Sequence, residues 1–190
     1  MTRAEPGPPF NLLLDRLPDS YQGFLIRTDY RIGIQISLCL QDEDLTREER
    51  AALALSLLYG EGVPPLETAL EGLAWFLSCG QPAREDVPPA FSPQRFWFDF
   101  DHARIAASFR KSFGIELHWA TLHWFEFMSL LDCVDEDSSL SHAIQLRGTD
   151  TSQMKGKQRR QIERAKRMVT PPRTYTAEER ELLEEFFGGA

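Results

Sequence analysis

Apolar residues recur with a helical period along most of the chain, and the longest such pattern covers residues 98–131. Two apolar segments within this block meet at Gly114, and a glycine after a periodic segment commonly ends a helix. The pattern therefore predicts two helices. The first ends at Phe113, and the second runs from about His118 to Cys133.

Capping residues set the limits of another expected helix. Thr46 stands three residues before Glu49, a spacing that lets each side chain satisfy the other's backbone N–H. This capping box predicts a helix over residues 47–59, which Gly60 or Gly62 would end.

Similar signals predict further helices. Pro64 and Pro65 precede an apolar segment that Gly80 ends, and a second capping box joins Thr176 to Glu179. The other expected helices cover about 66–79, 140–147 and 151–168, followed by a short one after Thr176.

The sequence of residues 29–42 is compatible with a strand and with a helix. Apolar residues from Tyr30 to Leu40 alternate strictly, which is the period of a strand, and Gly33 with its β-branched neighbours favours that interpretation. Tyr30, Ile34 and Leu38 also have the i, i+4 spacing of a helix. The residues alone leave both alternatives open.

These patterns predict a mainly α, compact domain of about six to eight helices. A small N-terminal β-hairpin around Gly23 is a further option. We expect a disordered segment at 1–9, a helical domain at 10–168 and an acidic tail with a short helix at 169–190. Residues 81–94 contain four prolines and predict a long loop.

Charge is uneven along the chain. The net charge is −8, yet residues 155–167 contain seven basic residues and one acid, which leaves −14 for the remainder. A basic helix can bind nucleic acid, but this acidic remainder would repel it, and no aromatic side chain within 155–167 offers a stacking platform. A partner-facing or solvated helix is favoured, with Lys157, Arg159 and Arg160 as candidate contacts and the acidic tail as a partial internal partner.

Four aromatic residues are further candidates for partner binding or self-association. Aromatic residues at helical spacing usually form a core, but these exceed what one helical stripe can bury, and Trp is a favoured interface anchor. The candidates are Trp75, Phe76, Trp119 and Trp124.

No catalytic or metal site is expected. His118 and His123 are five residues apart and have no third ligand at a metal-binding spacing. Asp99 and Asp101 precede an apolar helix beside His102, and a helix cap explains them better than catalysis does. No nucleotide, hydrolase or zinc-protease motif is present, so we expect neither enzymatic activity nor a cofactor.

The remaining chemical features also favour structural roles. Cys39, Cys79 and Cys133 are widely separated and lie in apolar runs, so we expect small buried side chains. The acidic segment 132–139 lacks the glycine and terminal glutamate of an EF-hand loop and is expected to be a turn. No apolar run is long enough to span a bilayer, and the N-terminus lacks a signal-peptide core, so we expect a cytosolic protein.

Several blocks of the chain together resemble the bacteriophage gene-product-fifteen family of siphophages and prophages. Phe113 stands where that family usually has Tyr, and Glu116 where it usually has Asp. The matching blocks are NLLLDRLP (11–18), IRTDYR (26–31), LQDEDLTREER (40–50), ALSLLYG (54–60), WFLSCG (75–80) and the whole of 98–131.

The resemblance implies a fold and a function. It implies a helix over 29–42 and a gene in the tail module, between the tail-tube and tape-measure genes. It therefore implies a non-enzymatic tail-assembly protein of the host cytoplasm that acts as a chaperone of the tape-measure protein. A structural component of the virion and a nucleic-acid-binding regulator that uses 155–167 are the alternatives.

Overall fold

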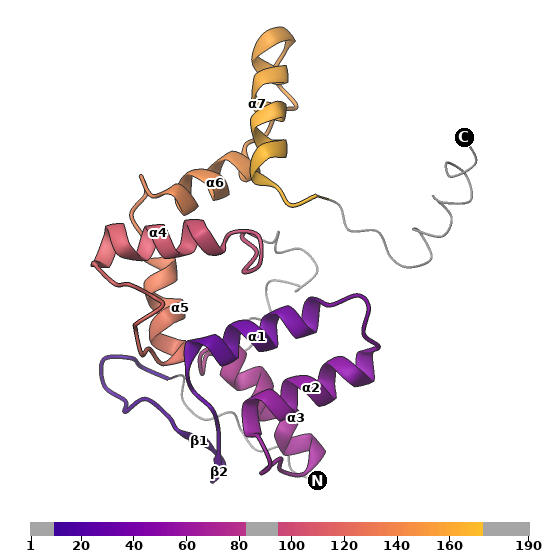
Figure 1. Ribbon diagram of the computed structural model, residues 1–190, viewed down its shortest axis with the longest axis vertical. Helices are drawn as coiled ribbons and strands as arrows, with labels where there is room; N and C mark the ends of the chain where they lie inside the picture. Colours follow the sequence, from indigo (N-terminus) through magenta and orange to yellow (C-terminus); the bar gives the residue numbers. More distant parts are fainter. Residues whose placement is uncertain (1–9, 83–94, 173–190) are drawn as a thin grey trace, which may run out of the picture.

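A computed structural model describes residues 10–82 and 95–172 of the chain. Within these ranges the chain forms seven helices and one two-stranded antiparallel hairpin, which confirms the expected mainly α fold with a small N-terminal hairpin (Figure 1). The elements are β1 (Ser20–Tyr21), β2 (Phe24–Leu25), α1 (Tyr30–Gln41), α2 (Arg47–Tyr59), α3 (Leu66–Leu77), α4 (His102–Phe113), α5 (Trp124–Asp132), α6 (Ser139–Gly148) and α7 (Gly156–Val169).

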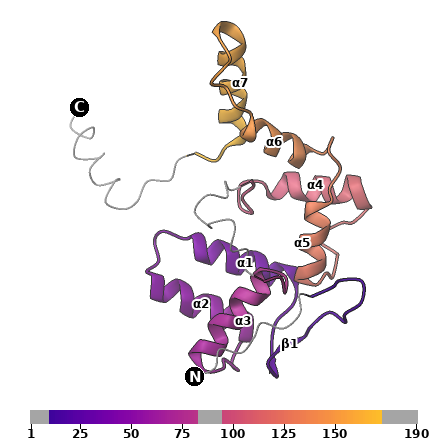
Figure 2. The ribbon, with the colours of Figure 1, turned by 180° about the vertical axis from the view of Figure 1, so that it is seen from behind.

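The elements form three groups along the long axis of the molecule. Both views place α1, α2, α3 and the hairpin at one end, α4, α5 and α6 in the middle, and α7 projecting at the other end (Figures 1 and 2). The expected N-terminal segment 1–9 and tail helix after Thr176 lie outside the described residues, as does most of the proline-rich segment 81–94. The proposed division of the chain into three parts stays a prediction.

Trp124 lies at the centre of the core. The residue is 2% exposed, and its indole ring packs near the rings of Phe76, Phe98 and Phe127, with centroid separations of 6.0, 6.2 and 5.9 Å. These rings come from α3, from the segment before α4 and from α5 itself. The aromatic cluster therefore joins α3 to α5 and to the segment before α4.

Helix α1 is positioned by a close contact with this ring. A Cβ atom built on Gly33 would lie 2.2 Å from the Trp124 ring, so only glycine lets the helix approach this closely. The helix buries Tyr30, Gly33 and Ile36, three residues apart, which is a helical face. The strand suggested by alternation at 29–42 is therefore wrong, and the helix implied by the family resemblance is confirmed.

Backbone pairing explains why α5 begins at Trp124 and not, as expected, near His118. The N–H of Trp124 donates to the carbonyl of Thr28 at 2.8 Å, and the N–H of Tyr30 donates to that of Leu122 at 3.0 Å. This antiparallel bridge holds the residues before Trp124 in an extended conformation that a helix cannot adopt.

Local signals located several other helix ends correctly. The capping box of Thr46 and Glu49 starts α2, and Gly114 ends α4 in the left-handed conformation with φ of 69°. The expected start of α7 at Thr151 or Ser152 is wrong by several residues. The helix begins at Gly156. The backbone turns into the helix there with a φ of 60°, a conformation that residues other than glycine rarely adopt.

A substitution at Gly33 tests the contact between α1 and Trp124. Alanine normally stabilises a helix relative to glycine, but here the added methyl group would overlap the indole ring. We expect Gly33→Ala to lower the free energy of unfolding by about 1–3 kcal/mol. Urea unfolding followed by tryptophan fluorescence measures this change.

Gly148→Ala is the matched control, because Gly148 also lies in a helix but a methyl group added there would meet no atom within 4 Å. Its stability should stay unchanged or rise by up to about 1 kcal/mol. Equal effects of the two substitutions would contradict the packing argument.

Candidate partner-binding surfaces

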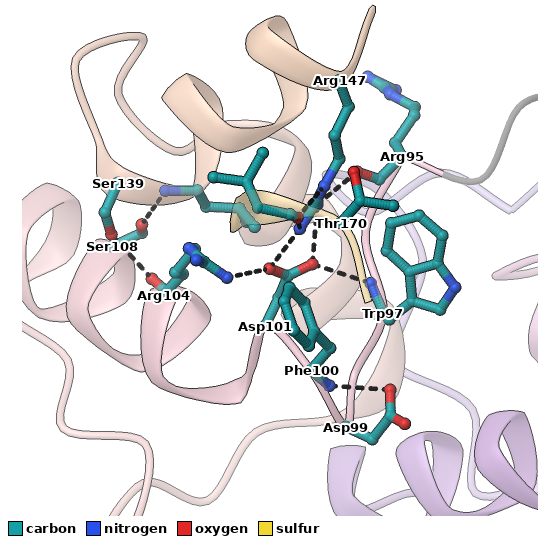
Figure 3. Close-up of polar contacts among 12 residues, drawn as sticks. Arg95, Trp97, Asp99, Phe100, Asp101, Arg104, Ser108, Ser139, Arg147 and Thr170 are labelled. Atoms are coloured by element: carbon teal, nitrogen blue, oxygen red, sulfur yellow. Dashed lines mark hydrogen bonds and ion pairs between the residues drawn. The ribbon is translucent and has the colours of Figure 1, made fainter. Parts of the chain in front are cut away.

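The carboxylate of Asp101 is the most deeply buried charge of the described residues (Figure 3). Arg147 donates two parallel hydrogen bonds to it, at 2.8 and 2.7 Å, and Arg104 donates a third at 2.8 Å. The backbone N–H of Trp97 donates a fourth at 3.0 Å. Asp101 and the Arg147 side chain are 0% and 8% exposed, so the pair is shielded from water.

Arg147 connects this carboxylate to the end of α7. Its guanidinium also donates to the carbonyl oxygens of Val169, at 2.7 Å from Nε, and of Arg95, at 3.0 Å. The same group lies 4.9 Å from the centre of the Trp97 ring. One side chain of α6 thereby holds the start of α4, the end of α7 and the segment that precedes α4.

The expected capping role of Asp101 is corrected by this geometry. Asp101 occupies the N-cap position of α4, but its side chain makes no capping hydrogen bond, because its oxygens accept from the two arginines and from Trp97 instead. Burial raises its pKa, but the hydrogen bonds from Arg147, Trp97 and Arg104 outweigh burial, and its net pKa is lowered. The carboxylate is therefore a structural anion and not an available acid or base.

His123 also has a structural role. Its Nδ1 accepts a hydrogen bond from the N–H of Phe125 at 3.0 Å and so caps α5. Its Nε2 lies 2.9 Å from the carbonyl oxygen of Pro18, and because Nδ1 accepts, we assign the proton to Nε2. Burial lowers the pKa of His123, partly opposed by the Pro18 carbonyl and by Glu126, which favours this neutral ring.

The described residues contain no group of three or more His, Cys, Asp or Glu side chains that could hold a metal ion. Cys79 is half-buried, and burial raises the pKa of its thiol to about 12. Cys39 is half-buried as well, whereas Cys133 is exposed, which corrects the expectation that all three are buried. The acidic turn at 132–139 ends in Ser138, the N-cap of α6.

Helix α7 presents the basic candidates on its exposed side. Lys157, Arg159 and Arg160 are all exposed, and none of the side chains of α7 is fully buried. Arg159 pairs with Glu163 at 2.7 Å one turn along the helix. The helix is attached to the protein body at its C-terminal end through Arg147 and through Lys166, whose Nζ donates to the carbonyl of Thr149 at 2.7 Å.

The four aromatic candidates occupy different environments. Phe76 and Trp124 are 0% and 2% exposed, so they belong to the core and offer no surface to a partner. Trp75 is half-buried and packs against the rings of Tyr21 and Phe125 at 5.1 and 5.4 Å. Trp119 alone among the four projects into solvent, at 81% exposure, from the loop between α4 and α5.

Two exposed leucines on α3 were not among the residues expected to bind a partner. Leu66 and Leu70, one turn apart, are 66% and 42% exposed, while Ala69, Leu73 and Phe76 form the buried face of the same helix. The width of the apolar pattern over α3 could have revealed this pair. One helix face cannot bury Leu66 and Leu70 together with Ala69, Leu73 and Phe76.

The fold and these surfaces define a helical protein whose buried polar groups serve its structure and whose exposed features suit contact with other molecules. No helix of the described residues has the length and apolar character to cross a membrane. The chain matches the family model described as bacteriophage Gp15 protein over residues 13–170, and it belongs to that family. This membership places it among phage structural and assembly proteins.

Two other comparisons are negative. No curated protein matches the chain, and no solved structure matches it.

Removal of Arg147 tests the role of the buried ion pair. Arg147→Met leaves the buried Asp101 carboxylate with one remaining guanidinium, and we expect a loss of about 3 kcal/mol in the free energy of unfolding. Arg104→Met, which removes a partner that is 29% exposed, should lower the free energy of unfolding by less.

The same ion pair makes stability depend on pH. Because the folded pKa of Asp101 is lowered, the contribution of Asp101 to stability is present above its ordinary pKa of 3.8 and is lost as pH falls through the folded value. Urea unfolding at several pH values measures both effects, and an acid profile unchanged by Asp101→Asn would contradict the assignment.

The cap of α5 gives a second pH-dependent prediction. His123→Ala should cost about 0.5–2 kcal/mol at neutral pH through loss of the cap. The folded pKa of His123 is lowered, so its contribution is present above its ordinary pKa of 6.5 and is lost as pH falls through the folded value. Thermal unfolding at a series of pH values should show the variant and the unmodified protein converging as the pH falls in this range. A constant difference would contradict the neutral ring.

Proposed function

We propose that the chain is a non-enzymatic tail-assembly protein that acts as a chaperone of the tape-measure protein in the host bacterial cytoplasm. The single observation that carries the proposal is the family match over residues 13–170. Phage tail proteins are the proposed partners, with the tape-measure protein first among them. Neither a cofactor nor a membrane has a part in the proposed role.

The exposed apolar residues support this function. A tape-measure protein is expected to be a long helical chain with apolar seams, and such seams bind other proteins through exposed apolar side chains on a helix or groove. Leu66 and Leu70 form such a stripe on α3, and Trp119 is a separate exposed aromatic anchor. These three side chains are the proposed apolar contacts.

The basic helix supports a second type of contact. Lys157, Arg159 and Arg160 lie on a helix that projects from the protein body, where an acidic partner can approach them (Figure 1). Charge complementarity of this kind increases the rate of association and selects partners.

Two alternative functions remain distinct proposals. A minor structural component would stay in the finished virion, so mass spectrometry of purified particles should detect it in stoichiometric amount. A regulator that binds nucleic acid is favoured only by the exposed cations of α7. It would bind duplex DNA at physiological salt, with binding lost on neutralisation of Lys157, Arg159 and Arg160.

Co-expression with the tape-measure protein of the same phage tests the chaperone proposal. We expect the chain to increase the soluble fraction of that protein and to co-purify with it. Leu66→Ser with Leu70→Ser should weaken co-purification by about tenfold, because apolar contact area is lost from α3. The measurements are sedimentation of the lysate and quantitative mass spectrometry of the purified complex.

The matched control is Leu13→Ser with Leu14→Ser. These leucines are 92% and 82% exposed but lie in the N-terminal turn and not on α3. The control should retain binding. No change in tape-measure solubility with the unmodified chain, or equal losses in both variants, would contradict the proposal.

A further inference from the structure

The exposed side of α7 carries a row of cations, which we call the basic stripe: Lys157, Arg160, Arg164 and Arg167. Their spacing of three, four and three residues places them on one side of the helix, and all four are exposed. Like charges at this spacing repel one another. Glu163, the one acid within α7, is already paired with Arg159. The stripe is therefore an excess of positive charge that an external anion can neutralise.

Helix α3 presents acids at a matching spacing. Glu67 and Glu71 are four residues apart, and both are exposed. A helix turns by about 100° per residue, so these acids lie about 100° around α3 from Leu66 and Leu70. The acidic side of α3 is therefore a surface of its own, next to the exposed leucines.

Charge is separated between the two ends of the molecule. Residues 42–71 contain eight acids, all exposed, and two basic residues, so their net charge is −6, against +6 for residues 155–167. Helices α3 and α7 lie at opposite ends of the long axis, with α4, α5 and α6 between them (Figures 1 and 2). The basic stripe therefore cannot reach α3 of its own chain, and only a second copy can bring these two surfaces together.

The two surfaces match in an antiparallel arrangement. Glu67 and Glu71 have the same separation as Arg160 and Arg164, so two antiparallel helices place each acid opposite one arginine. Val63 stands four residues before Glu67, and Met168 four residues after Arg164. Met168 and Val63 are 73% and 45% exposed, so the same arrangement adds an apolar contact beside the two ion pairs.

We propose that α7 of one copy docks in antiparallel orientation on α3 of a second copy. Glu67 then pairs with Arg164, and Glu71 with Arg160. The two surfaces differ, so the contact is heterologous and each copy keeps one surface of each pair free. Because the surfaces lie at opposite ends of the molecule, further copies join in an open row.

This association is weak and depends on salt. Ion pairs at a surface contribute little individually, and salt screens them. The row therefore forms and separates reversibly. The inference goes beyond the proposed function and does not depend on it, because it concerns copies of this chain alone and is measured without any other phage protein.

Sedimentation velocity of the full chain tests the proposal. We expect the average mass at low salt to rise with protein concentration beyond that of a dimer. It should return toward that of a monomer at about 0.5 M NaCl, where the Debye length is only about 4 Å. The measurement is made before and after nuclease treatment of the sample.

Two double variants identify the surfaces. Glu67→Gln with Glu71→Gln, and Arg160→Gln with Arg164→Gln, should each weaken self-association by about tenfold through the loss of two surface ion pairs. Glutamine is a good helix former, so both helices should be retained. In an equimolar mixture each variant keeps the surface that the other lacks, so the mixture should form a dimer and grow no further.

The matched control is Asp135→Asn with Glu136→Gln. Both residues are exposed in the turn between α5 and α6, and the change removes the same number of acids as the α3 variant. The control should associate as the unmodified chain does.

Four results would overturn the proposal. They are a monomer at every concentration and salt, an unmodified chain that stops at the dimer, equal losses in the α3 variant and the control, and a mixture of the two double variants that stays monomeric. Association that disappears after nuclease treatment would also contradict it, and would assign the basic stripe to nucleic acid.

Discussion

The structure around α7 depends on one constraint, which is that the buried carboxylate of Asp101 must be paired. An isolated charge in the interior is strongly destabilising, so Arg147 has to reach it across 46 residues of sequence. In doing so the guanidinium also fixes the carbonyl of Val169. The position of the projecting helix, and hence of its basic residues, follows from the burial of one anion.

The other end of the molecule depends on shape and not on charge. Gly33 allows α1 to lie against the face of Trp124, and the extended residues before Trp124 pair with those before Tyr30. The indole N–H of Trp124 has no acceptor among the described residues, so packing is the reason for a large ring at this position. Phe98 connects the buried ion pair to the aromatic packing, because it packs on Trp124 and lies a few residues before Asp101.

Features encoded within a few residues could be predicted from the sequence. The capping box of Thr46 and the stop at Gly114 depend on local backbone geometry alone, and both are correct. The failures involve distant partners. Alternation suggested a strand at 29–42 because periodicity does not reveal that a tryptophan almost a hundred residues away packs on Gly33. Asp101 occupies an ordinary capping position, and nothing beside it in the sequence indicates Arg147. The partner-binding role of the candidate residues stays a prediction. The structure shows only their exposure: the cations and Trp119 lie at the surface, Phe76 and Trp124 lie in the core, and the exposure of Leu66 and Leu70 was not predicted.

The division between buried and exposed chemistry bears on function. Asp101 and His123 were weighed in the sequence as catalytic or metal-binding groups. Both side chains form hydrogen bonds that hold helices in place. The exposed groups of the described residues include Leu66, Leu70, Trp119 and the cations of α7. Such groups bind through apolar contact and through charge, and both contacts can be reversed. Reversible contact is what an assembly factor requires, because it must hold a partner during assembly and release it afterwards.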